Sequence, residues 1–289
     1  MTDTDITTRR ATRRTRWLAE IRSLLGLGLV VIGLHSLVAK PFYIPSESMM
    51  PGLQVGDRLV VSKYPYGWSY ASASFHVLPF IKGRLFGRLP ERGDIVIVSP
   101  PDAERRGDDL IKRVIGLPGD IVQMIDGRLW LNGQPVATQD MGYRQLAVDG
   151  NFHCDANDLD RERAFPGFAD ARITGAGGKV YCRVHMLRET LPGGRSYDIL
   201  DFGRSGADDT APYIVPADHV FVLGDNRDNS ADSRVAVESN GLGGAVPFEN
   251  IGGRAEFVTF SLNGNATWNP LTWLSAFRGS RFGMSLRSQ

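Results

Sequence analysis

The residues with the clearest chemical potential are two serines, Ser46 and Ser48, in the stretch Ile44-Pro45-Ser46-Glu47-Ser48-Met49-Met50-Pro51. Pro45 and Pro51 restrict the backbone, so we expect this stretch to be stiff and extended. Side chains alternate along an extended chain, so the two serines would point to the same side. One hydroxyl could act as a nucleophile and the other as a hydrogen-bond donor beside it. Serine next to proline is also common in turns, so a purely structural role stays open at this point.

A serine nucleophile needs a base, and histidine is the commonest one. The chain after residue 40 offers His76, His153, His185 and His219, and none lies in a stretch typical of a catalytic triad. Lys112 is a second candidate, because in a strand it shares a face with Leu110 and Val114. Burial lowers a lysine pKa by up to about 3 to 5 units, and a neutral amine can take a proton from serine. Periodicity alone also allows Lys112 to reach solvent from a strand edge.

Four segments follow the apolar N-terminal run in order: Pro45-Ser-Glu-Ser-Met-Met-Pro51, Gly56-Asp57 with the strand that follows, Lys112-Arg113-Val-Ile-Gly-Leu-Pro-Gly-Asp120, and Gly224-Asp-Asn-Arg-Asp-Asn-Ser-Ala-Asp-Ser-Arg234. Together they resemble the bacterial type I signal peptidase (leader peptidase) family. These motifs cover about a fifth of the chain, and their joint order is specific. The resemblance implies a serine endopeptidase that uses a Ser-Lys dyad and no cofactor or metal.

Transferred position by position, the resemblance assigns a role to each motif residue. It implies that Ser48 is the nucleophile and Lys112 the general base, with the oxyanion held by the Ser48 backbone N–H and the Ser46 hydroxyl. The supporting residues would be Ser230, which orients the amine, Asp232 and Arg234, which brace their loop, and Gly224 and Asp225 beside them. Ile44 and Ile111 would line shallow pockets for small side chains, in keeping with cleavage after small-x-small (Ala-x-Ala-like) sites. The substrate would be an extended signal peptide bound by strand addition.

The apolar run from Ser23 to Ala39 carries no charge and follows a cluster of arginines at positions 9, 10, 13, 14 and 16. A helix of about 17 residues spans roughly 26 Å, close to the hydrocarbon thickness of a bilayer. A cleavable signal peptide is the alternative, but its apolar segment would be unusually long, and Pro41 would closely follow any cleavage point. We therefore expect a single-pass anchor in the inner (cytoplasmic) membrane. The arginines would stay in the cytoplasm, and residues after Lys40 would lie on the periplasmic side.

Strand patterns dominate the rest of the chain, so we expect a mainly β fold. Residues 95–98 and 220–223 are apolar runs, residues 121–125 read as a further strand, and Asp126-Gly127 and Asn132-Gly133 predict hairpin turns. The family resemblance implies a coiled, barrel-like antiparallel sheet for the catalytic domain. The sequence after residue 140 predicts a smaller β-rich insertion that contains only short strands. The expected division is a basic N-terminus (1–22), an anchor (23–39), a catalytic domain in two parts (40–140 and 218–289) and a glycine-rich insertion (141–217). A short helix bearing Leu271 and Trp273 is expected after Asn269-Pro270.

Cys154 and Cys182 would lie outside the cytoplasm, where a disulfide persists. Free thiols and a zinc site with His153 and His185 are the alternatives, although adjacent ligands chelate one tetrahedral ion awkwardly. The net charge of +1 argues against a general nucleic-acid binder. The expected partners are signal peptides of secreted preproteins, the lipid bilayer and a nearby secretion translocon. A conjugation- or pilus-associated processing peptidase and a non-catalytic, membrane-tethered peptide-binding module remain as rival functions.

Overall fold

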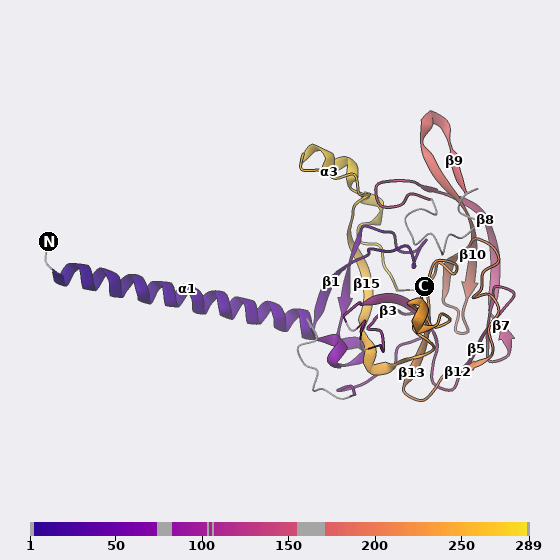
Figure 1. The fold of residues 1–289 in the computed structure, drawn as a ribbon, viewed down its shortest axis with the longest axis horizontal. Coiled ribbons are helices and arrows are strands. Elements are labelled where there is room, and N and C mark those ends of the chain that lie inside the picture. The colour runs from indigo at the N-terminus through magenta and orange to yellow at the C-terminus, as the bar shows by residue number, and fades with distance from the viewer. Residues whose placement is uncertain (1–2, 74–82, 103, 106, 155–170, 288–289) are drawn as a thin grey trace.

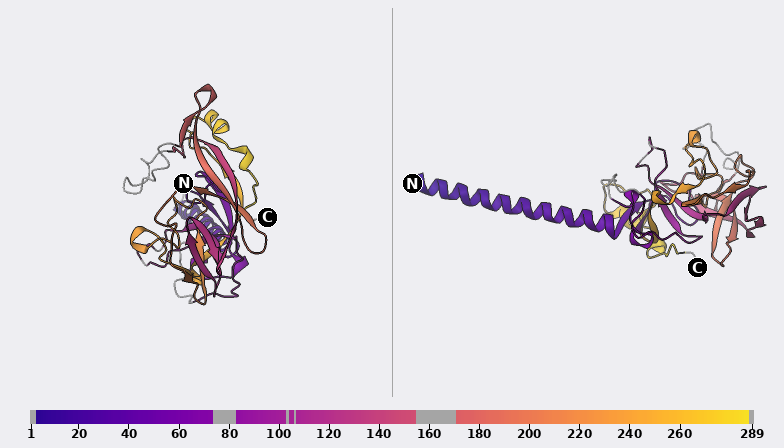
Figure 2. Two further views of the ribbon diagram at one scale, coloured as in Figure 1. Left: turned by 90° about the vertical axis from the view of Figure 1, so that its right-hand side faces the viewer. Right: turned by 90° about the horizontal axis from the view of Figure 1, so that it is seen from below.

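A long N-terminal helix projects from a β-rich domain in the computed structural model (Figures 1 and 2). The structure describes residues 3–73, 83–102, 104–105, 107–154 and 171–287. Helix α1 spans Asp3–Leu37, and its segment Arg16–Leu37 is long and apolar enough to cross a membrane. The predicted anchor thus lies in a helix, but this helix ends at Leu37 and not at Ala39. Ala39 instead begins strand β1 (Ala39–Tyr43), and Pro41 favours the extended conformation at Lys40, because the residue before a proline is disfavoured in the helical conformation.

The largest sheet has seven strands in the order β1-β2-β15-β3-β4-β13-β14, and all neighbours are antiparallel. Its strands are β1 (Ala39–Tyr43), β2 (Asp57–Ser62), β15 (Ile251–Ser261), β3 (Ile95–Val98), β4 (Leu110–Gly116), β13 (His219–Leu223) and β14 (Val246–Pro247). The long strand β15 changes register against both of its neighbours. Such bulges bend a strand and increase its twist, which helps the sheet to curl. The strands predicted at 95–98 and 220–223 are confirmed.

A second sheet, in the order β12-β5-β6-β7, is built from the predicted hairpins. Its strands are β5 (Ile121–Ile125), β6 (Arg128–Leu131), β7 (Gln134–Pro135) and β12 (Tyr213–Ile214). Asp126 and Gly127 both have positive φ, 51° and 73°, as a two-residue hairpin turn of type I′ requires. The turn chemistry of this region was therefore readable from the sequence.

The third sheet corrects the expectation of short strands after residue 140. It contains β8 (Ala137–Ala147), β9 (Arg172–Thr174), β10 (Val180–Thr190) and β11 (Ser196–Asp201), and β8 and β10 are each 11 residues long. Strand β8 runs across the predicted boundary at 140/141. One buried cluster joins Tyr197 and Ile199 of β11 to Met124 of β5 and Phe221 of β13. The glycine-rich segment thus shares a core with the flanking parts of the chain.

Short helices complete the described chain. Helix α3 spans Leu271–Ala276, and Asn269 Oδ1 accepts the Leu271 N–H at 3.1 Å, which confirms the predicted short helix. The 3₁₀ helices are Tyr64–Tyr66, Tyr70–Ser72, Ala176–Gly178, Val237–Ser239, Phe248–Asn250 and Gly279–Arg281. Trp68 Nε1 donates to the Leu37 carbonyl at 2.9 Å and so fixes the end of α1 against the domain. His76 lies outside the described residues.

Candidate active site

Ser48 and Lys112 meet near the beginning of strand β4. Lys112 Nζ donates to Ser48 Oγ at 3.0 Å and to the carbonyl oxygen of Ile111 at 2.9 Å. Both residues are buried, with Lys112 2% and Ser48 8% exposed. Because the Lys112 side chain is almost fully buried, the alternative in which it reaches solvent from a strand edge is wrong. The contact places an amine within proton-transfer distance of a serine hydroxyl.

The surroundings of Lys112 favour its neutral form. Burial lowers the pKa of Lys112 to about 8, although the carboxylates of Asp232 and Asp225 act in the opposite direction. At that pKa about one amine in ten is neutral at pH 7. The lysine is therefore a usable base without any histidine.

The two hydroxyls of the Ser46–Ser48 stretch lie side by side, with 3.3 Å between their oxygens. The backbone is less extended than predicted, because it bends at Ser46 and turns from Ser48 onward. Met50 N–H donates to the Glu47 carbonyl at 2.9 Å within this turn. Within the described chain, the Ser48 N–H has no hydrogen-bond acceptor, so it remains available as a donor. An N–H and a hydroxyl on one side of a nucleophile can together hold an oxyanion.

Strand β13 leads into the polar loop 224–234, which packs against the nucleophile. Asn226 N–H donates to the Ser48 carbonyl at 3.1 Å. Gly224 lies so close to this stretch that a Cβ added there would be 2.6 Å from the Ser48 carbonyl oxygen and 2.1 Å from Ser230 Oγ. Only glycine, which has no Cβ, allows the two backbone segments to lie this close. This explains why the motif has a glycine at position 224.

Two buried ion pairs hold this loop in shape. Asp232 accepts the Gly224 N–H at 2.9 Å and pairs with Arg234 at 2.9 Å. Burial would raise the pKa of Asp232, but Arg234 and the Gly224 N–H outweigh it and keep that pKa below its ordinary value. Arg113 donates to both carboxylate oxygens of Asp225 at 2.7 Å. Breaking such a buried pair by removing one partner costs about 3–5 kcal/mol.

The hydroxyl of Ser230 does not contact the Lys112 amine in the way that the resemblance implies, because this amine is hydrogen-bonded to Ser48 and to Ile111. Ser230 Oγ is buried and has no hydrogen-bond partner among the described residues. The Ile111 carbonyl, and not Ser230, accepts the second hydrogen bond of the Lys112 amine. Ser230 nevertheless lines the same pocket as Ser48 and Lys112.

The pocket at the dyad has a volume of about 680 Å³. Its lining includes Ser46, Ser48, Leu110, Lys112 and Ser230, together with Arg105, Asn151, His153 and Asn229. The side chains expected to line substrate pockets, Ile44 and Ile111, are not part of this lining. They are 1% and 6% exposed and pack in a core cluster with Met49 and Leu53. A contact of Ile44 or Ile111 with substrate therefore stays a prediction.

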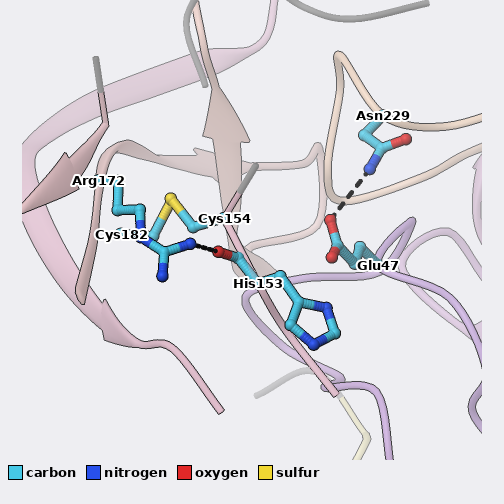
Figure 3. Close-up of a disulfide and its surroundings, with 6 residues drawn as sticks. All are labelled: Glu47, His153, Cys154, Arg172, Cys182 and Asn229. Atoms are coloured by element: carbon cyan, nitrogen blue, oxygen red, sulfur yellow. Dashed lines mark hydrogen bonds between the residues drawn. A yellow bond between two sulfur atoms is a disulfide. The ribbon is translucent and has the colours of Figure 1, made fainter. Parts of the chain in front are cut away.

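Other residues at the pocket were not singled out from the sequence. Asn229 Nδ2 donates to the Glu47 carboxylate at 3.2 Å, as Figure 3 shows, and Asn226 Nδ2 donates to the Glu47 carbonyl at 3.3 Å. Both asparagines belong to the loop motif 224–234. The high proportion of polar residues in this motif was the sequence feature that could have identified them. Glu47 stands between the two serines, and only its position pointed to the site.

Cys154 and Cys182 form a disulfide, which confirms the favoured prediction and excludes free thiols or zinc ligation by these sulfurs. The bond lies close to the pocket, and beside it Arg172 donates to the His153 carbonyl at 2.9 Å (Figure 3). Both cysteines belong to a buried cluster with Met50, two positions after Ser48. The disulfide therefore supports the segment that carries the nucleophile.

Comparison with known proteins agrees with these features. Residues 14–260 match the family described as "Signal peptidase, peptidase S26". Signal peptidase I of Rickettsia typhi is 35% identical over 248 residues, which cover 83% of this chain and 78% of that protein. Signal peptidase I of Rickettsia akari is 34% identical over 243 residues, covering 80% of this chain and 75% of its own. A crystal structure of a signal peptidase I from Enterococcus faecalis aligns with 58% of this chain and 97% of its own, at 23% identity and a TM-score of 0.27. The family match spans residues 14–260, which is most of this chain. The chain therefore belongs to the peptidase S26 family of signal peptidases and is a peptidase.

Proposed function

We propose that this protein is a membrane-bound serine endopeptidase that removes signal peptides from secreted preproteins after small-x-small sites. The observation that carries the proposal is the 3.0 Å hydrogen bond between Lys112 Nζ and Ser48 Oγ, made by an amine whose pKa burial lowers to about 8. A buried lysine beside a serine is one of the arrangements that replaces the Ser-His pair of other proteases.

The reaction follows from this geometry. The neutral Lys112 amine takes the Ser48 hydroxyl proton as Oγ attacks the scissile carbonyl carbon. The Ser48 N–H and the Ser46 hydroxyl donate to the oxyanion that forms. The resulting ammonium then gives its proton to the leaving amine, which departs as the N-terminus of the mature protein. Lys112 next takes a proton from water, the hydroxide attacks the acyl-Ser48 ester, and Ser48 recovers its proton.

Strand addition explains how an extended peptide would bind. Strand β13 pairs with β4 only from Arg113, opposite Leu223, onward. The edge of β4 at Leu110–Lys112 therefore extends beyond β13 and borders the pocket. A substrate strand along this edge would bring its scissile carbonyl to Ser48. Ser230, which has no partner in the described chain, could then turn its hydroxyl toward the Lys112 amine, as the family resemblance implies.

The membrane part of the proposal rests on α1 and on the exposed surface of the domain. Figure 1 shows α3 on the side of the domain from which α1 projects. Trp268, Leu271 and Leu274 are exposed there. Tryptophan is enriched at membrane–water interfaces, which suits a surface held against lipid headgroups. We place α1 in the inner membrane with its arginines in the cytoplasm, and the domain on the periplasmic side near the secretion translocon.

Cleavage of a secretory precursor by the full-length protein in detergent tests the proposal. Wild type is expected to cut after a small-x-small triplet, mapped by mass spectrometry, whereas Ser48→Ala and Lys112→Met are expected to be inactive. Lys63→Met is the matched control, because Lys63 is equally buried and burial also lowers its pKa to about 8, but it lies outside the pocket lining.

The outcomes separate the rival functions. If Lys63→Met also loses activity, the loss in Lys112→Met would come from disturbed folding and not from the removal of a catalytic base. Retained cleavage by Ser48→Ala would exclude the dyad. A folded wild type that binds precursors without cutting them would favour the peptide-binding module, and cleavage of pilin-type precursors alone would favour the pilus-associated peptidase.

A further inference from the structure

The hairpin formed by β10 and β11 places a buried carboxylate behind the catalytic loop. Glu189 of β10 is 1% exposed and accepts hydrogen bonds from Tyr197 of β11 and from Arg227 of the loop. The Tyr197 hydroxyl donates to Glu189 Oε2 at 2.6 Å, and Arg227 Nη1 donates to Glu189 Oε1 at 2.6 Å, while Arg227 Nη2 also donates to this carboxylate. The motif residue Arg227 is thus held by residues far outside any motif.

Backbone hydrogen bonds fix the same hairpin to the loop. Leu200 N–H of β11 donates to the Asp225 carbonyl at 3.0 Å, and Arg227 N–H donates back to the Leu200 carbonyl at 3.1 Å. Phe202 N–H donates to the Asp228 carboxylate at 2.7 Å. Residues 225–228 therefore lie along β11 like a short added strand.

From Arg227 the contacts continue to the nucleophile. Its Nε donates to the Gly224 carbonyl at 3.3 Å, and its own carbonyl accepts Arg234 Nη2 at 2.6 Å. The next residue back, Asn226, donates its N–H to the Ser48 carbonyl. A shift of Arg227 would thus move the backbone that holds Ser48.

The charges around Glu189 are balanced by direct contacts. Arg227 pairs with Glu189, and Arg113 pairs with Asp225. The ring of Tyr197 lies 4.1 Å from the Arg113 guanidinium. Burial and the charge of Glu189 raise the pKa of Tyr197, so its hydroxyl stays protonated and acts as a donor. Removing the charge of Glu189 would leave a buried arginine without its counterion, which would disturb its position.

We propose that Glu189, oriented by Tyr197, is a positioning residue for the nucleophile, acting through Arg227 and Asn226. This inference rests on the proposed Ser48–Lys112 function. It gives the glycine-rich segment 141–217 a part in the reaction, because β10 and β11 belong to that segment. Misplacement of a catalytic group by about 1 Å can cost roughly a hundredfold in rate, so a distant support of this kind matters for turnover.

Steady-state cleavage of a secretory precursor by the full-length protein tests the role. Glu189→Gln is expected to lower kcat by roughly ten- to a hundredfold with little change in KM, because it alters the alignment of Ser48 and not the peptide groove. Tyr197→Phe, which keeps the ion pair, is expected to lower kcat by a smaller factor. Glu189→Asp keeps the carboxylate and should recover part of the loss.

Asp198→Asn is the matched control. Asp198 pairs with Arg188 across the same two strands at 2.7 Å, but neither side chain has a hydrogen bond or an ion pair with loop 224–234 in the described structure. The kcat of Asp198→Asn should equal that of wild type. Activity of wild type and Asp198→Asn tests the proposed function by itself, whereas the difference between Asp198→Asn and Glu189→Gln tests this inference.

Rates are compared per folded molecule, measured by near-ultraviolet circular dichroism. Wild-type kcat in folded Glu189→Gln would overturn the inference, and so would a rise in KM at constant kcat. If Glu189→Gln does not fold, Tyr197→Phe decides. A lowered kcat at constant KM supports the positioning role, and wild-type kcat contradicts it.

Discussion

Lys63 and Lys112 are both buried, and burial lowers the pKa of each to about 8, yet their surroundings differ. Lys63 Nζ donates to the Gly252 carbonyl at 2.8 Å, whereas Lys112 Nζ also reaches the hydroxyl of Ser48. Burial alone thus makes an amine that can lose its proton at moderate pH. In the proposed mechanism, the serine within hydrogen-bond distance is what gives the Lys112 amine a catalytic use.

The lowered pKa of Lys112 predicts the pH dependence of cleavage. The ammonium form cannot accept the Ser48 proton, so kcat/KM should rise about tenfold per pH unit below the pKa and level off above about pH 8. Initial rates between pH 5.5 and 9.5, with an unfolding control at each pH, measure the profile. A midpoint near about 6.5, the ordinary histidine value, would point to a different base.

The oxyanion role of Ser46 predicts a loss confined to turnover. Ser46→Ala should lower kcat by about 10²–10³-fold, or about 2.7–4 kcal/mol of transition-state stabilisation, with KM nearly constant. Ser46→Thr keeps a hydroxyl at the same place and is the matched control. Equal turnover in wild type and Ser46→Ala would leave the Ser48 N–H as the main donor.

Burial of Lys112 also predicts a trade between activity and stability. Its pKa falls from 10.5 in the unfolded chain to about 8 in the folded one, which at about 1.4 kcal/mol per unit corresponds to about 3 kcal/mol. Below pH 8 the folded protein bears this cost in full, and the cost disappears as the pH rises to 10.5. Lys112→Met should therefore raise the free energy of unfolding at pH 7 by up to about 3 kcal/mol. Denaturant titrations at pH 7 and 10.5 measure the difference, and a gain that is equal at both values would contradict this origin.

At the scale of elements, the sequence predicted the strands that carry the motifs but not those of the third sheet. Residues 95–98 and 220–223 are apolar runs, buried on both faces, and their pattern is unambiguous. Strand β8 has intermediate or exposed residues along its whole length, so it shows no alternation that a sequence could reveal. Its partner residues in β10 are 34 to 53 positions away along the chain, from the pair Ala147–Tyr181 to the pair Ala137–Thr190. The contact of Glu189 with Arg227, 38 residues apart, was hidden for the same reason.

The disulfide closes a loop of 28 residues at the rim of the pocket. A cross-link over a loop of this length stabilises a protein by about 2–4 kcal/mol, mainly through the unfolded state. The double variant Cys154→Ala/Cys182→Ala should therefore unfold at a lower denaturant concentration. Because both cysteines share a buried cluster with Met50, which lies two positions after Ser48, cleavage should fall as well. Wild type treated with a reductant is the control. If the double variant and the reduced wild type both unfold at the same denaturant concentration as the oxidised wild type, the buried cluster around Cys154 and Cys182 is stable without the disulfide.

At the scale of the whole molecule, the chain combines one apolar helix with a domain that carries exposed apolar residues of α3 on the side from which that helix projects. The sequence predicted the anchor from its uncharged run, and the structure places this run as far as Leu37 in α1. It did not predict that β1 begins two residues after the helix ends and pairs with β2. This short connection ties the dyad-bearing sheet to the anchor, since the Ser46–Ser48 stretch follows β1 directly. A site so placed would meet peptides close to the bilayer surface.

The distribution of charge predicts the orientation of the whole molecule. Arginines 9, 10, 13, 14 and 16 precede the span, and positively charged flanks stay in the cytoplasm. Single cysteines introduced by Thr8→Cys and by Glu238→Cys, the latter at an exposed position of the domain, report the two sides. In spheroplasts a membrane-impermeant maleimide should label Glu238→Cys at once and Thr8→Cys only after lysis. Replacing the five arginines by glutamine should weaken this asymmetry if charge sets the orientation. Labelling of Thr8→Cys in intact spheroplasts would show that the chain has the opposite orientation. The domain would then lie in the cytoplasm, apart from preproteins that have crossed the membrane.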